Sequence, residues 1–114
     1  MTKYLVRSTH EPCDCPTYMS DDNPIKKGAI EWLARRDSLA ADCGVKVLSD
    51  VLDPPAHVEV MIVEAESPAG LAKFLLSSPV VVKTETRPVT TYEELFGGKS
   101  AQEFLDELKK AKGG

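Results

Sequence analysis

Two helix starts marked by proline divide this chain and constrain the order of its elements. Asn23-Pro24 and Ser67-Pro68 each place a preferred N-cap residue before a proline, which fits the first turn of a helix. Apolar residues then recur at helical spacing, as far as Gly44 in the first case and as far as the next proline in the second. The chain is therefore predicted to contain two helices, each with segments of another kind on both sides.

Four strand patterns surround these two helices. Strand-like alternation or β-branched runs occur over residues 3–10, 45–52, 57–66 and 80–89. An Asp-Pro-Pro turn joins the second pattern to the third and predicts a hairpin. The element order is β-α-β-β-α-β, which predicts an α+β fold of the ferredoxin-like type, a four-stranded sheet with helices on one face.

The third strand pattern is apolar on both of its sides. Val58, Val60 and Ile62 alternate with Met61 and Val63. A sheet with one face in water carries apolar residues mainly on its other face, so this strand needs cover on both. The helices can cover one face, and we expect a second copy of the chain to cover the other, as a homodimer.

The length of 114 residues fits one domain, which we place at residues 1–96, followed by a C-terminal helical arm at residues 97–114. Thr91 and Ser100 each stand three residues before a glutamate, the capping-box pattern, so two helical pieces are expected after the last strand. The second piece has an apolar stripe, which predicts that the arm docks on the domain or on a partner copy.

Composition excludes several classes of protein. The net charge is −4 and the basic residues are scattered, which argues against a nucleic-acid partner. No apolar run approaches the roughly 18 residues of a membrane span. Three cysteines, an odd number, do not form a disulfide framework, and the first residues lack the apolar core of a signal peptide. We therefore expect a cytoplasmic protein.

The loop after the first strand gathers residue types that bind metals. His10, Cys13 and Cys15 lie within six residues. His57 opens the third strand pattern, and the first and third strands are expected to be antiparallel neighbours, so His57 should lie beside His10. Thiolate and imidazole together suit zinc, nickel or copper, and these four residues predict a Cys2His2 site. Against it, one residue between the cysteines is fewer than structural zinc loops favour.

The same residues allow three other interpretations. The histidines can satisfy strand ends while the cysteines serve as small apolar side chains. Cys13 and Cys15 can alternate between thiols and a strained disulfide, as a redox switch. His10 or His57 can act as a general base, with Glu59 as an acid–base or orienting group. Sequence reasoning leaves these alternatives open.

Tyr4, Ser8 and Met61 are predicted ligand-binding residues. They would face the space between the two sheets of the homodimer and give a mostly apolar pocket with a few polar groups, as small-molecule sites usually have. Core packing across the dimer accounts for the same residues without a ligand.

Several segments resemble the dimeric α+β barrel superfamily, especially its small bacterial and archaeal members, over about residues 3–95. These segments are Ser8-Thr9-His10, Glu66-Ser67-Pro68-Ala69 and the run from Arg87 to Glu94. The resemblance implies that two sheets pack face to face across a dimer axis and enclose a cavity on each side. Members include muconolactone isomerases, cofactor-free monooxygenases, haem-degrading enzymes and metal-binding modules, so the fold alone transfers no activity.

These observations together predict a homodimeric barrel protein that binds a small molecule or a transition metal. The first alternative is a cofactor-independent enzyme, of isomerase or monooxygenase type, acting on a small organic substrate. The second is a structural or protein-interaction module that acts through the C-terminal arm.

Overall fold

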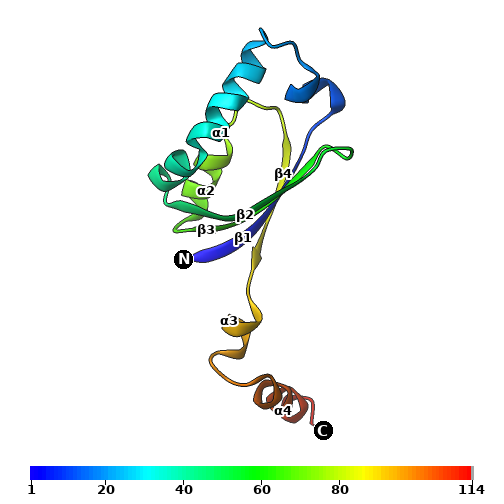
Figure 1. The fold of residues 1–114 in the computed structure, drawn as a ribbon. Helices are drawn as coiled ribbons and strands as arrows, with labels where there is room; N and C mark the ends of the chain where they lie inside the picture. The colour runs from blue at the N-terminus through cyan, green and yellow to red at the C-terminus, as the bar shows by residue number, and fades with distance from the viewer. Residues whose placement is uncertain (114) are drawn as a thin grey trace.

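The computed structural model describes residues 1–113, which form a mixed α+β structure built on one four-stranded antiparallel sheet (Figure 1). The strands are β1 (Thr2–Thr9), β2 (Val45–Asp53), β3 (Val58–Ala65) and β4 (Lys83–Val89). Their order across the sheet is β2-β3-β1-β4, so β1 lies between β3 and β4. The predicted pairing of the first and third strands is confirmed, with Val6 opposite Met61 and Thr9 opposite Val58.

Two helices, α1 (Pro24–Asp42) and α2 (Pro68–Leu75), lie on the same face of this sheet (Figure 1). Their predicted caps are confirmed. The Asn23 side chain accepts a hydrogen bond from the Ile25 backbone N–H at 2.8 Å, and the Ser67 hydroxyl accepts one from the Gly70 N–H at 3.0 Å. Each cap satisfies a backbone donor that the first helical turn leaves without a partner.

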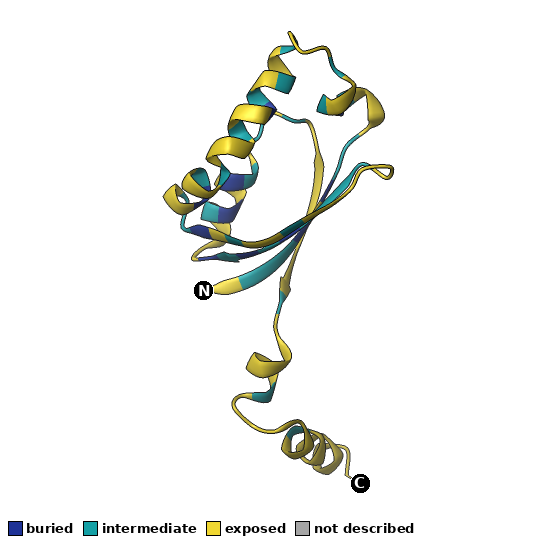
Figure 2. Ribbon diagram, viewed as in Figure 1, coloured by how far each residue is buried: buried dark blue, intermediate teal, exposed yellow. Residues whose placement is uncertain are grey.

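The hydrophobic core lies between the sheet and these two helices (Figure 2). Val6, Met61 and Val63 from the sheet and Phe74 from α2 are almost completely buried. Trp32 of α1 stacks on Phe74, with ring centroids 5.7 Å apart. These contacts hold α1 and α2 against the sheet.

Within residues 1–113 the other face of the sheet carries no helix (Figure 1), and its apolar residues gather along β3, with charged side chains on the flanking strands. Val58, Val60 and Ile62 of β3 are half-buried, and Val51 of β2 is 59% exposed. Leu5 of β1 lies opposite Ile62 and belongs to the same face. The prediction that the third strand is apolar on both sides is therefore confirmed. We call this surface the bare face.

The pairing of β2 with β3 contains a β-bulge. Val47 pairs with Val63 and Ser49 with Ile62, so the register shifts between Val47 and Ser49. A bulge moves every later side chain of its strand to the opposite face. Asp50, which pairs with Met61, is thereby placed on the face covered by the helices.

Two expected boundaries are wrong. β4 begins at Lys83 rather than at residue 80. His57 does not open β3; it ends the hairpin turn with φ +54°, in the left-handed region, whereas a strand requires a strongly negative φ. The loop after β1 forms two short 3₁₀ turns, η1 (Pro12–Asp14) and η2 (Pro16–Tyr18).

The predicted pair of C-terminal helices is present as α3 (Tyr92–Phe96) and α4 (Ala101–Ala111), capped by Thr91 and Ser100. Gly114, the end of the predicted arm, lies outside the described residues. The Phe104 and Phe96 rings join the two helices, with centroids 4.9 Å apart. Figure 1 shows α4 projecting beyond the sheet, on the side away from α1 and α2.

No helix within residues 1–113 is both long and apolar enough to cross a bilayer.

Candidate metal centre

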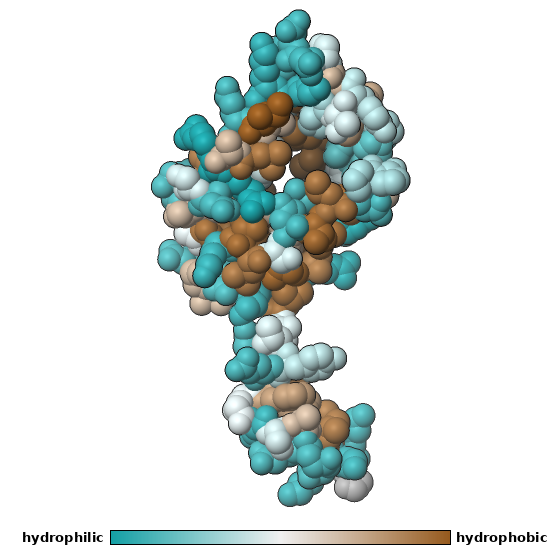
Figure 3. All heavy atoms as spheres, in the orientation of Figure 1, coloured by the Kyte–Doolittle hydropathy of each residue, from teal (hydrophilic) through white to brown (hydrophobic). Residues whose placement is uncertain are grey.

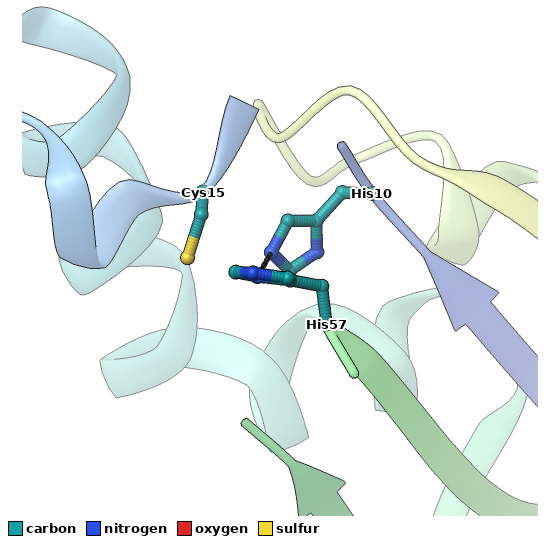
Figure 4. Close-up of side chains that lie close together, drawn as sticks. All are labelled: His10, Cys15 and His57. Atoms are coloured by element: carbon teal, nitrogen blue, oxygen red, sulfur yellow. Dashed lines mark hydrogen bonds between the residues drawn. The ribbon is translucent and has the colours of Figure 1, made fainter. Parts of the chain in front are cut away.

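The ends of two neighbouring strands bring His10, Cys15 and His57 together. His10 follows β1 and His57 precedes β3, and because these strands are antiparallel their two ends meet. The His10 backbone N–H donates to the His57 carbonyl at 3.3 Å, which extends the pairing by one step. Cys15 comes from the junction of η1 and η2, and Figure 4 shows its sulfur directed toward the two rings.

The spacing of the three side chains matches that of metal ligands. The Nδ1 atom of His57 lies 3.3 Å from the Nε2 atom of His10 (Figure 4), and all three ligand atoms lie within 4.8 Å of one another. Two nitrogens bound to a tetrahedral zinc at about 2.0–2.1 Å lie about 3.3 Å apart. The two rings are within hydrogen-bonding distance of each other, and the same separation suits two nitrogens bound to one zinc ion.

The backbone around His57 is held in an unusual conformation. The turn before β3 is closed by hydrogen bonds from His57 N–H to the Pro54 carbonyl at 3.1 Å and from Ala56 N–H to the Asp53 carboxylate at 3.4 Å. A left-handed φ is uncommon for a residue other than glycine and costs free energy. The Tyr18 ring meets the imidazole edge-on, with centroids 5.6 Å apart, and limits its orientation.

The three cysteines lie in different surroundings, and only one belongs to the cluster. Cys15 is only 7% exposed and belongs to the cluster, whereas Cys13 is exposed and lies outside it. Cys43 caps the C-terminus of α1 and packs against the core. Three of the four residues predicted for a metal site therefore lie together, and the fourth, Cys13, does not join them.

The local electrostatics favour a neutral imidazole at His10. Burial lowers the pKa of His10 below 6.5, the nearby His57 lowers it further, and Asp14 opposes both effects. A histidine binds metal only in its neutral form, so a lowered pKa keeps the ligand atom available near pH 7.

A cavity of about 370 Å³ adjoins the cluster, between the sheet and α1. Its walls include His10, Cys15 and two of the predicted ligand-binding residues, Ser8 and Met61. The third, Tyr4, packs against the core instead. Figure 3 shows brown apolar atoms around the hollow between α1 and the segment that leads into β4. The predicted residues thus face the helices, and the space they line lies within one chain.

Glu59 also lines this cavity and has unusual electrostatics. Burial, followed by the charge of Asp50, raises the pKa of Glu59 to about 7, while Arg36 acts in the opposite direction. Arg36 of α1 forms an ion pair with Asp50. The Oδ1 atom of Asp50 is buried without a hydrogen-bond partner among residues 1–113. A proton on Glu59 would give this oxygen a donor.

Sequence reasoning found Glu59 but missed Asp50 and Arg36. Simple alternation along β2 from Val45 puts Asp50 on the bare face, and only the bulge places it beside Glu59. The sequence around residue 48 contains neither glycine nor proline to mark that bulge.

Comparison of the chain with protein-family models and with curated proteins finds no match.

Proposed function

We propose that this protein binds a transition metal ion, zinc in the first place, through His10, Cys15 and His57. The observation that supports this most directly is the 3.3 Å separation of the two imidazole nitrogens, with the Cys15 sulfur in the same cluster. Three protein ligands leave one position of a tetrahedral zinc for an outside ligand, as in catalytic rather than structural sites. Copper and nickel accept the same donors and are the competing ions.

Cobalt(II) titration of the metal-free protein tests this proposal. A Cys15 thiolate bound to cobalt gives a charge-transfer band in the near ultraviolet, and tetrahedral coordination gives strong visible bands. We expect a one-to-one complex that zinc displaces. Cys15→Ala should lose the charge-transfer band, and Cys13→Ala, a matched control in the same loop, should keep it.

His57→Asn is the cleanest histidine variant, because asparagine tolerates the left-handed backbone at this position while removing the imidazole. Losing one of three ligands should weaken cobalt affinity by at least tenfold, by analogy with the effect of altering groups that support a metal site. Equal affinity of wild type, Cys15→Ala and His57→Asn would overturn the proposal.

A second candidate function rests on the position of Glu59 in the cavity wall together with His10, where its raised pKa suits a general acid–base group near neutral pH. The metal-free protein would then move protons on a bound organic molecule, with His10 or His57 as the partner base. Deuterium exchange at the α-carbons of phenylacetone, followed by NMR in the presence of a chelator, tests this function. Exchange should be lost in Glu59→Gln and kept in Glu64→Gln on the opposite face of β3; no acceleration by the wild type would refute it.

We further propose that the sheet is ferredoxin-like and that two copies pack through their bare faces as a dimeric α+β barrel. The strand order is the one expected of that fold, and Val60 and Ile62 form the apolar centre of a face that no helix of residues 1–113 covers. Arg7 of β1 lies opposite Glu85 of β4 on the same face. This face therefore carries both positive and negative side chains, which a self-complementary two-fold interface can pair between copies. Val60→Asp should give single chains in sedimentation equilibrium, whereas Leu76→Asp at the exposed end of α2 should not. A monomeric wild type at micromolar concentration would refute the dimer.

A further inference from the structure

The cavity beside the cluster has the size of a binding site for a small organic molecule. Its volume is about 370 Å³. A dry apolar cavity of about 150 Å³ accommodates benzene, so this one has room for on the order of 15 non-hydrogen atoms. Ligand sites commonly begin at about 300 Å³.

The walls of the cavity are mainly apolar. Much of the lining comes from three side chains of α1, the last residue of α2 and two residues between α2 and β4: Ile30, Trp32, Leu33, Leu75, Val80 and Val82. Such a surface favours the hydrocarbon part of a ligand, because burying it removes apolar area from water.

Several of the polar groups along these walls already have partners. The Ser8 and Thr84 hydroxyls lie 3.3 Å apart and bond to each other. The Lys26 ammonium donates to the Asp21 carboxylate at 2.8 Å and to the Met19 carbonyl at 3.2 Å. Lys26 is therefore already paired with residues of the preceding loop. The described lining contains no other lysine or arginine side chain that could bind an acidic group of the ligand.

The metal cluster borders the cavity. Cys15 lines the cavity, His57 lines a separate groove on the outer side, and His10 lines both. An ion held by these three residues would lie at the boundary between the two spaces. Its fourth coordination position is then the strongest polar anchor available to a molecule in the cavity.

We propose that the cavity binds a small, mainly apolar organic molecule with one oxygen-donor end, and that this end coordinates the metal ion. The inference rests on the proposed metal site and goes beyond it by assigning the class of ligand. The apolar walls select the body of the molecule, and the ion selects its donor end.

Three probes separate these two contributions. Benzohydroxamate has a chelating end and a ring, acetohydroxamate has the same chelating end without the ring, and benzamide has the ring with a much weaker donor. Trp32 is the only tryptophan of the chain and lines the cavity, so its fluorescence reports binding. For the zinc-loaded protein we expect benzohydroxamate to bind at least tenfold more tightly than either other probe, since burying a ring is worth this factor or more.

Ala29→Leu is the matched test of the cavity. Ala29 is buried and lines it, so the larger side chain should fill part of the space, whereas Ala34→Leu makes the same change at an exposed position of the same helix. Ala29→Leu should reduce benzohydroxamate affinity to the level of acetohydroxamate and leave cobalt affinity unchanged. If Ala29→Leu fails to fold, Val82→Phe, in the irregular segment before β4, tests the same space.

The outcomes separate this inference from the metal proposal. Normal cobalt binding with equal affinity for the two hydroxamates, or with no effect of Ala29→Leu, would overturn the ligand class and leave the metal site intact. Equal benzohydroxamate affinity with and without zinc would overturn coordination by the ligand. Absence of metal binding would remove both proposals.

Discussion

Replacing Glu59 by glutamine should make the protein more stable at alkaline pH and leave its stability at acidic pH almost unchanged. Glutamine has the shape of glutamic acid and its amide can donate to the buried Oδ1 atom of Asp50, which lacks a partner. It therefore imitates the protonated form of Glu59 at every pH.

The magnitude follows from the pKa of Glu59, which rises from 4.5 to about 7 on folding. A raised carboxyl pKa means that the folded state holds its proton more tightly, so the stabilisation is complete below about pH 4.5 and is lost as the pH rises toward 7. At about 1.4 kcal/mol per pKa unit the upper limit is about 3.5 kcal/mol. Solvent screening of a partly exposed group reduces the expected loss to about 1–2 kcal/mol.

Urea unfolding of the metal-free protein at pH values from 5 to 8, followed by Trp32 fluorescence, measures this loss. The difference between Glu59→Gln and wild type should grow by about 1–2 kcal/mol over this range. Taking the difference cancels the titration of the histidines, which are present in both proteins. Glu64→Gln, on the other side of β3, should keep the wild-type slope. Parallel pH curves for wild type and Glu59→Gln would refute the account of the Glu59 and Asp50 pair.

Three further predictions concern backbone positions. His57→Gly should raise the unfolding free energy of the metal-free protein by up to about 1 kcal/mol in urea titration, because glycine adopts φ +54° without strain; a loss of stability would show that packing of the ring prevails. Gly70→Ala should cost about 1–3 kcal/mol, since an added Cβ would lie 2.2 Å from the Cys43 carbonyl oxygen, and an unchanged thermal midpoint would contradict this close approach. Asn23→Ala should cost about 1 kcal/mol through loss of the bond to the Ile25 N–H, with Asn23→Ser retaining most of the stability.

The topology was predictable because its signals are local. Asn23 and Ser67 cap their helices through their own side chains, and strand alternation records which residues face the core. Once the element order is known, few arrangements of four strands and two helices remain. The meeting of His10 and His57 follows directly from the antiparallel pairing of β1 and β3.

The details of the site were less predictable because they depend on backbone irregularities. Cys13 and Cys15 have the same ligand chemistry, and only the two 3₁₀ turns decide that Cys15 is buried in the cluster. The proximity of Asp50 to Glu59 could not be predicted, because the bulge in β2 moves Asp50 to the cavity side of the sheet. A bulge without glycine depends on packing across the sheet and leaves little trace in the sequence.

The positions of these irregularities support a functional interpretation of the cluster. The left-handed residue, His57, and the paired 3₁₀ turns around Cys15 both lie at the end of the sheet where His10 leaves β1. Glycine would adopt this backbone conformation without strain. Strained residues persist where surrounding structure holds them, most often at sites of function. The histidine that makes the turn less favourable also brings an imidazole nitrogen into the cluster, so the proposed metal site would give a reason for this residue at the turn.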